Sequence, residues 1–311
     1  MSVIDVEHLT KDYGSGRGVF DVSFRVDKGE VFGFLGPNGA GKSTTIRHLM
    51  GFSKPDSGST KIFGRETFEK YFEILGRVGY IPGEIALPAG LTGWEFLRMM
   101  QALQKCRNEE RLAYLLKIFE LDPSGETKRM SLGVKRKLAV VAAFMSDPDV
   151  LILDEPTSGL DPVMQDVFVD FIKKEKERGK TILLSSHIFS EVDATCDRIA
   201  IIKDGRLVSD FNADDLRHSS QKIYEVYFAD AATYLTFLAN YKNSRLLRVI
   251  AEDRRSASVL ISTEDKYINE VIRILSGFGM RNFSHMKETL EDYFMSYYKE
   301  DKEKNRVYYE Y

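Results

Sequence analysis

The chain has 311 residues, of which 43% are hydrophobic and 29% are charged, and its formal net charge is −3. This length is sufficient for two domains, and the composition is typical of a soluble globular protein. The slight negative charge offers no broad basic surface, so we expect no nucleic-acid partner. The longest apolar run, Leu138–Met145, is far shorter than the roughly 20 residues that cross a bilayer. The chain is therefore not expected to form a membrane pore by itself.

The first two-thirds of the chain alternates between strand and helix patterns. Apolar or alternating strand patterns occur at residues 3–9, 18–26, 30–36, 150–155, 181–187 and 198–208. Helical patterns follow residue 43, run through about 93–147, and recur near 163–178. In the second strand Phe20, Val22, Phe24 and Val26 are predicted to share one face. Continuous apolar strands alternating with helices predict an α/β domain with a buried, largely parallel sheet.

Beyond about residue 218 a new series of elements begins. Strand patterns lie at 222–228, 246–251 and 257–263, and helical patterns at 230–241, 264–278 and 289–298. With a further strand expected between the last two helical patterns, the order is roughly β-α-β-β-α-β-α, which predicts a small α+β domain of ferredoxin-like order. We therefore expect domains at 1–217, with a helical subdomain at about 84–148, and at 218–298, followed by a charged tail at 299–311.

A phosphate-binding loop is predicted at residues 36–43, whose sequence GPNGAGKS matches G-x-x-x-x-G-K-[ST]. An apolar strand precedes it and a helix follows it, which is the required context. Glycines let backbone amides face the phosphates, Lys42 can reach the β- and γ-phosphates, and Ser43 can ligate Mg²⁺. The alternative is a glycine-rich turn without a ligand. The residues predicted to bind the nucleotide here are Gly36, Pro37, Asn38, Gly39, Ala40, Gly41, Lys42, Ser43 and Thr44.

Three further segments resemble those of the ABC ATPase family. Residues 150–156, VLILDEP, resemble its Walker B strand, and TSGLDP at 157–162 resembles the D-loop that follows. The resemblance implies that Asp154 holds Mg²⁺ and that Glu155 orients the attacking water. MSLGVKRKL at 130–138 resembles the signature motif, usually LSGGQ. It implies that Ser131 and Gly133 contact the γ-phosphate of a nucleotide bound to another subunit.

Two single residues also match positions of this family. His187 ends the strand 181–187 and resembles the histidine that binds the γ-phosphate, while Tyr13 resembles the A-loop aromatic residue that stacks on adenine. A structural histidine and an ordinary turn tyrosine are the alternatives. The resemblance thus implies ATP and Mg²⁺ as cofactors, with Lys42, Glu155 and His187 as the catalytic residues.

One position departs from the family, which usually has glutamine after the strand that precedes its helical subdomain (the Q-loop). The matching residue here is Gly83, followed by Glu84. Glycine cannot supply a side-chain oxygen, and whether Glu84 replaces it stays open at this point. The same segment is expected to receive a membrane partner. Its apolar residues Leu87, Leu91, Trp94 and Phe96 either form that surface or pack the helical subdomain.

The resemblance covers about residues 2–215 and implies the ATP-hydrolysing motor subunit of an ABC transporter. Such a subunit is peripheral on the cytoplasmic face of the membrane, bound to a polytopic permease and to a second ATPase subunit, here expected to be a second copy. KETLEDYFMSYY at 287–298 resembles the end of ABC-2 exporter motors, which favours export. The alternatives are an importer motor, a soluble ABC ATPase of an assembly or remodelling complex, and a subunit that Gly83 has made inactive.

Overall fold

The computed structural model describes residues 1–217, 221–242, 244–286 and 289–295. Contacts divide the chain into two compact units, Met1–Ala213 and Asp214–Tyr311, whereas the sequence analysis placed the division after residue 217. Each unit is described by itself. The predicted tail at 299–311 and the last three residues of the predicted final helix, 296–298, lie outside the described residues.

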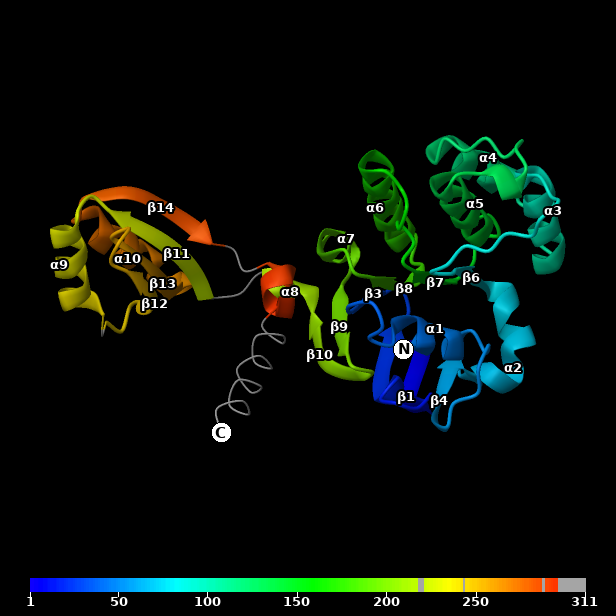
Figure 1. The fold of residues 1–311 in the computed structure, drawn as a ribbon, viewed down its shortest axis with the longest axis horizontal. Helices are drawn as coiled ribbons and strands as arrows, with labels where there is room; N and C mark the ends of the chain where they lie inside the picture. Colours follow the sequence, from blue (N-terminus) through cyan, green and yellow to red (C-terminus); the bar gives the residue numbers. More distant parts are fainter. Residues whose placement is uncertain (218–220, 243, 287–288, 296–311) are drawn as a thin grey trace. The chain divides into compact units, whose positions relative to one another are not determined.

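The first unit contains ten strands in two sheets (Figure 1). The strands are β1 (Ser2–Asp12), β2 (Gly18–Asp27), β3 (Val31–Leu35), β4 (Ser57–Ile62), β5 (Arg65–Glu66), β6 (Val78–Ile81), β7 (Val150–Asp154), β8 (Thr181–Ser186), β9 (Arg198–Lys203) and β10 (Arg206–Asn212). Four of them form an antiparallel sheet in the order β2-β1-β4-β5. The other six form a sheet in the order β10-β9-β3-β8-β7-β6, in which every pair except β9 and β10 is parallel.

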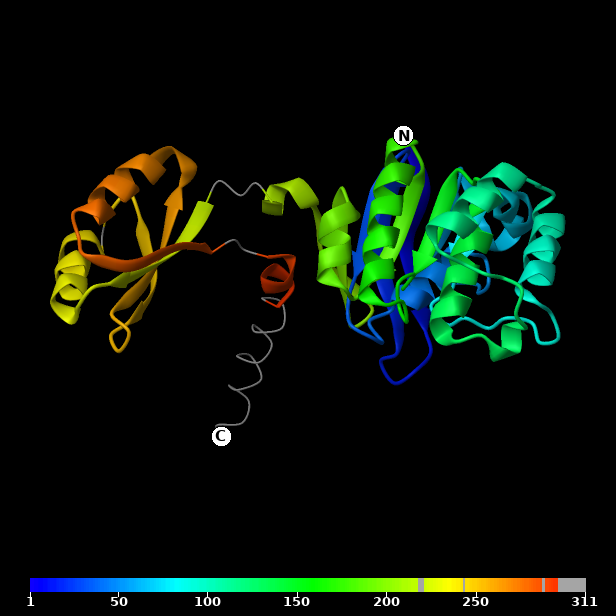
Figure 2. The same cartoon turned by 90° about the horizontal axis from the view of Figure 1, so that it is seen from above.

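Helices cover this sheet and join its strands. They are α1 (Lys42–Leu49), α2 (Thr67–Ile74), α3 (Gly93–Gln104), α4 (Glu109–Ile118), α5 (Leu132–Phe144), α6 (Pro162–Glu177) and α7 (Phe189–Thr195), with short 3-10 turns at Leu75–Arg77 and Thr127–Arg129. A short helix, α8 (Ala213–Arg217), follows β10 at the division between the two units. Figures 1 and 2 show α3, α4 and α5 grouped at the β6 end of the six-stranded sheet. None of the helices in the described ranges is both long and apolar enough to cross a bilayer.

The predicted alternation in β2 fails at one position. Val22, Phe24 and Val26 are buried as expected, but Val19 takes the buried place that was assigned to Phe20. Asp21 lies between them with φ of 57°, and the pairing of β1 with β2 is irregular here. A residue in the left-handed region interrupts the pleat, so the side chains on either side of it change face.

The helical part of the first unit is joined to α6 by an aromatic core. The ring of Phe171 on α6 lies 4.9 Å from that of Phe144 and 5.2 Å from that of Phe119, both in edge-to-face geometry. All three side chains are buried. Such pairs bury large apolar areas and also gain from their ring geometry.

The second unit has the predicted ferredoxin-like order. Its elements are β11 (Gln221–Phe228), α9 (Ala231–Tyr241), β12 (Arg248–Asp253), β13 (Ser258–Glu264), a 3-10 turn (Asp265–Tyr267), α10 (Ile268–Ser276) and β14 (Met280–Met286). They form an antiparallel sheet in the order β12-β13-β11-β14. A further helix begins at Leu290, where Thr289 and Asp292 exchange side-chain and backbone hydrogen bonds in a capping box. The two units confirm the predicted fold class.

Replacing Phe171 by alanine is expected to lower the free energy of unfolding of the first unit by about 3–5 kcal/mol, because it leaves a cavity among the aromatic rings. The only tryptophan, Trp94, lies on α3, so its fluorescence measures the unfolding of this unit in urea. Leu103→Ala on the same helix is the control, since Leu103 is 69% exposed. An equal loss of stability in both variants would contradict the assigned core.

Candidate functional site

Parallel pairing brings the ends of three strands to one edge of the sheet. Leu35 of β3 is opposite Ser186 of β8, and Asp154 of β7 is opposite Ser185 of β8. The carboxyl ends of parallel strands point the same way, and ligand sites of α/β sheets lie there. The segments that follow β3, β7 and β8 carry Lys42, Glu155 and His187, respectively.

The loop at residues 36–41 requires glycine at two places. A Cβ atom on Gly36 would lie 2.5 Å from the carbonyl oxygen of Ile202, and one on Gly41 would lie 2.7 Å from Val19. Gly41 also has φ of 110°, a conformation that side chains disfavour. Helix α1 starts directly after it, without a side-chain cap. Its first amide groups thus lack side-chain partners and form an anion-binding helix N-terminus.

Lys42 is held over this loop by two backbone carbonyl groups. Its side chain is 5% exposed, and Nζ donates to the oxygens of Gly36 and Pro37 at 2.5 and 3.3 Å. The same Nζ lies 3.1 Å from Oε1 of Glu155. A buried ammonium group requires such partners, because an unpaired charge is costly to bury.

Glu155 connects Lys42 with His187. Its second carboxylate oxygen lies 2.5 Å from Nδ1 of His187, whose side chain is half exposed. Glu155 has φ of 50°, which is rare for a residue with a side chain and marks a strained backbone. Asp154, the preceding residue, is 2% exposed and accepts a hydrogen bond from the hydroxyl of Ser185. The structure therefore brings together four of the predicted residues.

The loop that carries Tyr13 lies beside the phosphate loop. The carbonyl oxygen of Gly18 would be 3.3 Å from a Cβ atom on Gly41, so the turn between β1 and β2 reaches the start of α1. Tyr13 itself is 55% exposed, and its ring lies 5.8 Å from Nζ of Lys11. Its role in stacking on a base stays a prediction.

The predicted signature residues lie at the start of α5 and contact the D-loop of the same chain. Ser131 caps α5 by accepting a hydrogen bond from the amide of Val134 at 3.3 Å. A Cβ atom on Gly133 would lie 3.1 Å from the carbonyl oxygen of Gly159. Within the described ranges, no hydrogen bond or ion pair joins Ser131 or Gly133 to residues 36–44. The signature motif therefore has no polar contact with the phosphate loop of its own chain.

Gly83, where the family has glutamine, lies directly against Asp154. A Cβ atom at this position would be 3.0 Å from Oδ2 of Asp154, so a larger residue would have to displace that carboxylate. Glu84 is exposed. Thus Gly83, which has no side chain, is the residue that lies next to the Asp154 carboxylate.

Glu191 was not identified from the sequence, although it lies within the site. It is 4% exposed on α7, and its Oε2 accepts hydrogen bonds from Ser186 and Thr157 at 2.7 and 3.2 Å. Burial raises the pKa of Glu191 to about 7, while these two hydrogen bonds lower it. The available signal was an acidic residue beside Val192 and Thr195 on the buried face of a short helix. This carboxyl group joins the segment after β7 to that after β8.

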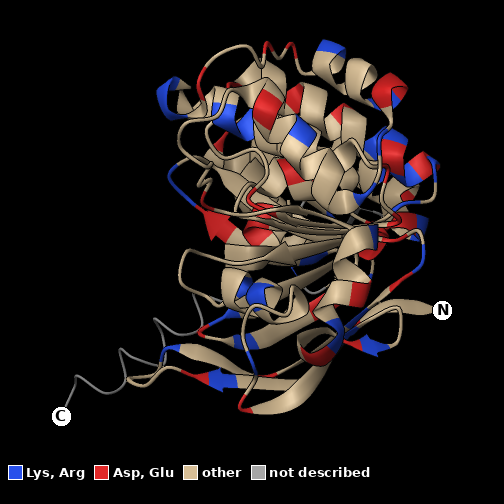
Figure 3. Cartoon of the chain, turned by 90° about the vertical axis from the view of Figure 1, so that its right-hand side faces the viewer, with Lys and Arg blue, Asp and Glu red and all other residues tan. Residues whose placement is uncertain are grey.

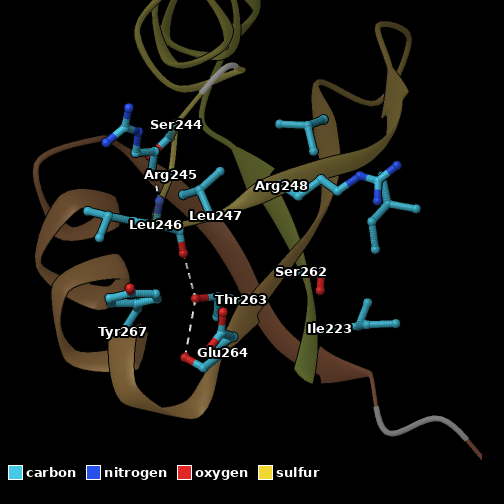
Figure 4. Close-up of a pocket in the computed structure, with 12 residues that line it drawn as sticks. Ile223, Ser244, Arg245, Leu246, Leu247, Arg248, Ser262, Thr263, Glu264 and Tyr267 are labelled. Atoms are coloured by element: carbon cyan, nitrogen blue, oxygen red, sulfur yellow. Dashed lines mark hydrogen bonds between the residues drawn. The ribbon is translucent and has the colours of Figure 1, made fainter. Parts of the chain in front are cut away.

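A hollow of about 440 Å³ on the second unit contains none of the predicted site residues (Figure 4). The hydroxyl of Thr263, which lines the hollow, donates a hydrogen bond to the carbonyl oxygen of Leu246 at 2.7 Å. Figure 4 shows the side chains of Arg245 and Arg248 extending in opposite directions. They do not converge on a common ligand position.

Comparison with known proteins supports the interpretation of the first unit. Residues 19–158 match the family model described as ABC transporter. The chain is 33% identical over 299 residues to the bacitracin transport ATP-binding protein BcrA of Bacillus licheniformis, covering 94% of this chain and 96% of the relative. It is 37% identical over 221 residues to the daunorubicin/doxorubicin resistance ATP-binding protein DrrA of Streptomyces peucetius, covering 70% of this chain and 67% of the relative.

Two solved structures are similar. An ATP-binding subunit of an ABC transporter superimposes with a TM-score of 0.65 at 34% identity, covering 70% of this chain and 92% of that one. The dimeric bacterial cassette MJ0796 superimposes with a TM-score of 0.62 at 24% identity, covering 68% of this chain and 98% of that one. This likeness concerns the fold alone. Together with the phosphate loop and the paired acids, these similarities show that the chain is an ATP-binding, ATP-hydrolysing subunit of the ABC transporter family.

Proposed function

We propose that Lys42, His187 and Glu155 act on the γ-phosphate of ATP. Lys42 and His187 both contact the carboxylate of Glu155. An incoming γ-phosphate carries more negative charge than a carboxylate and competes for both partners. Glu155 is then released to orient the attacking water, and Lys42 and His187 neutralise charge on the transferred group.

Mg²⁺ is proposed to bind between Ser43, Asp154 and the phosphates. The hydroxyl of Ser43 is exposed at the start of α1, and the Asp154 carboxylate lies at the end of β7. Oxygen donors of this kind fit Mg²⁺, which commonly uses one or two protein ligands and completes its shell with phosphates and water. The described residues contain no cluster of three or more His, Cys, Asp or Glu side chains that could hold a metal ion. The ion would supply charge neutralisation at the phosphates.

A second copy of the chain is proposed to complete each ATP site. Ser131 and Gly133 make no polar contact with the phosphate loop of their own chain. Beside them, Leu132 and Val163 are 57% and 71% exposed at the starts of α5 and α6. Exposed apolar side chains next to an incomplete site suit an interface with another subunit.

The partner in the membrane is proposed to dock in an apolar groove of about 570 Å³ on the first unit. The groove is formed by the segment after α1, by α2 and the 3-10 turn that follows it, by β6 and the segment after it, and by α3 and α5. Phe72 and Leu103 on its rim are 66% and 69% exposed. Burial raises the pKa of Tyr80, which lies in the groove, to about 12, so its hydroxyl stays uncharged. A cytoplasmic helix of a polytopic permease, with its apolar face inward, fits such a groove.

Two of the four residues predicted for this surface line the groove. Leu87 and Phe96 are among its lining residues, and Phe96 is 8% exposed. Leu91 and Trp94 are not among them, although Trp94 is 37% exposed. On the face of the first unit shown in Figure 3, acidic and basic residues are interspersed, and this mixture does not favour nucleic acid as the partner.

Export is the proposed direction of transport. The relatives include a bacitracin transport protein and a drug-resistance protein, and the match to BcrA spans 94% of this chain, which includes most of the second unit. We place the chain on the cytoplasmic face of the membrane, with the second unit as an accessory domain outside the ATP site. The exposed apolar groove is the observation that carries the proposed docking of a membrane partner.

Glu155→Gln is expected to lower the rate of ATP hydrolysis by at least about 10²-fold, the usual contribution of a group that activates the nucleophile. ATP binding is retained, because the amide keeps the size of the side chain and frees Lys42 from its ion pair. Phosphate release and equilibrium ATP binding measure the two effects. Glu177→Gln, at an exposed position on α6, is the matched control. Full hydrolysis by Glu155→Gln would exclude the proposed role of Glu155.

Purification of the tagged chain from its native membranes is expected to recover a polytopic membrane protein in stoichiometric amount. Leu103→Asp should reduce that recovery about tenfold, which corresponds to about 1.4 kcal/mol of binding free energy. Tyr114→Asp is the control, since Tyr114 is 41% exposed on α4 and does not line the groove. Recovery from the soluble fraction alone would indicate a soluble ABC ATPase instead.

A further inference from the structure

Arg136 is the largest fully buried side chain among the described residues, and it is 2% exposed. It lies in α5, shortly after the signature residues. All three guanidinium nitrogens donate to backbone carbonyl oxygens: Nε to Ser158 at 2.9 Å, Nη1 to Pro82 at 2.9 Å and Nη2 to Gly83 at 2.8 Å. One side chain thus holds two loops that are far apart in sequence.

Both loops adjoin the acidic residues of the ATP site. Gly83 lies against the Asp154 carboxylate, as shown by the 3.0 Å separation that a Cβ atom would have from Oδ2. The amide of Ser158 donates to the carbonyl oxygen of Glu155 at 3.2 Å. A shift of either loop therefore displaces the surroundings of one of these acids.

The guanidinium group is suited to this arrangement. Its planar fork presents donors in fixed directions, whereas glutamine has one short amide and lysine a single nitrogen. Burial lowers the pKa of Arg136, and the charges of Asp154 and Glu155 act in the opposite direction. A buried charge is tolerated when its hydrogen bonds are satisfied, as they are here.

A second contact joins α5 to the same D-loop. A Cβ atom on Gly159 would lie 2.8 Å from the Leu132 side chain, so glycine is required where Leu132 covers the loop. Gly159 has φ of 86°, which also favours glycine. Leu132 and Arg136 are four residues apart and lie on neighbouring turns of α5. Together they attach the D-loop to the signature helix.

We propose that Arg136 is a positioning residue that couples the signature helix to both acids of the ATP site through the Q-loop and the D-loop. In this chain Arg136 holds the backbone of Gly83, at the position where the family usually has glutamine. The inference rests on the proposed function for the roles of Asp154 and Glu155. The hydrogen bonds of Arg136 go to the backbone carbonyl oxygens of Ser158, Pro82 and Gly83, so it acts through these loops.

The test compares Arg136→Gln and Arg136→Lys in the full chain with Arg107→Gln, which removes an arginine that is 80% exposed in the loop before α4. Amide hydrogen exchange is measured on peptides that contain residues 82–84 and 157–160. Arg136→Gln is expected to speed exchange in both segments, with Arg136→Lys intermediate and Arg107→Gln unchanged. Turnover at saturating ATP should fall about tenfold to a hundredfold, while the affinity for ATP changes by less than about twofold.

Three outcomes would overturn the inference. Exchange could stay as in the unaltered chain at either segment, turnover could fall only in proportion to the folded fraction, or Arg136→Gln could behave as Arg107→Gln does. If Arg136→Gln does not fold, Arg136→Lys decides, because it keeps the charge and lacks the fork. Hydrogen exchange needs no hydrolysis, so it tests the coupling even if Glu155 proves not to be the catalytic residue.

Discussion

The parallel pairing of β3, β8 and β7 is the constraint on which the ATP site depends. It fixes the distance between three loops that come from distant parts of the chain. Because the strands are buried on both faces, their register cannot slip without exposing apolar side chains. The ends of these strands are therefore held in fixed positions, and so are the starting points of the loops that follow them.

Pairing between charged side chains connects the loops at the ends of these strands. Lys42 is almost fully buried, and it is paired with Glu155 and with two carbonyl oxygens. Glu155 is in turn shared with His187. Glu155, the proposed catalytic acid, thus pairs with both groups that are proposed to bind the γ-phosphate. Under this proposal, nucleotide binding exchanges one anion for another, so Lys42 is not left buried without a partner.

Buried polar side chains connect these loops to the rest of the first unit. Glu191 joins the segments after β7 and β8 from one side, and Arg136 joins the Q-loop and D-loop from the other. Both hydrogen-bond to backbone carbonyl or hydroxyl groups and not to the residues proposed to bind the nucleotide. Movement of the helical part of this unit, where the membrane partner is proposed to dock, would reach the two acids through Arg136.

Local patterns in the sequence were sufficient for the phosphate loop, the Walker B strand and the ferredoxin-like order of the second unit. Each depends on residues that are adjacent or periodic along the chain, and neighbouring residues set turn chemistry and the side-chain period directly. The expected face of Phe20 was wrong, because the left-handed conformation of Asp21 leaves no periodic signal. The contacts of Glu155 with Lys42, of Gly83 with Asp154 and of Arg136 with three carbonyl groups were accessible only from the folded chain. They join segments that only the order and register of the strands bring together, and no local pattern encodes that order.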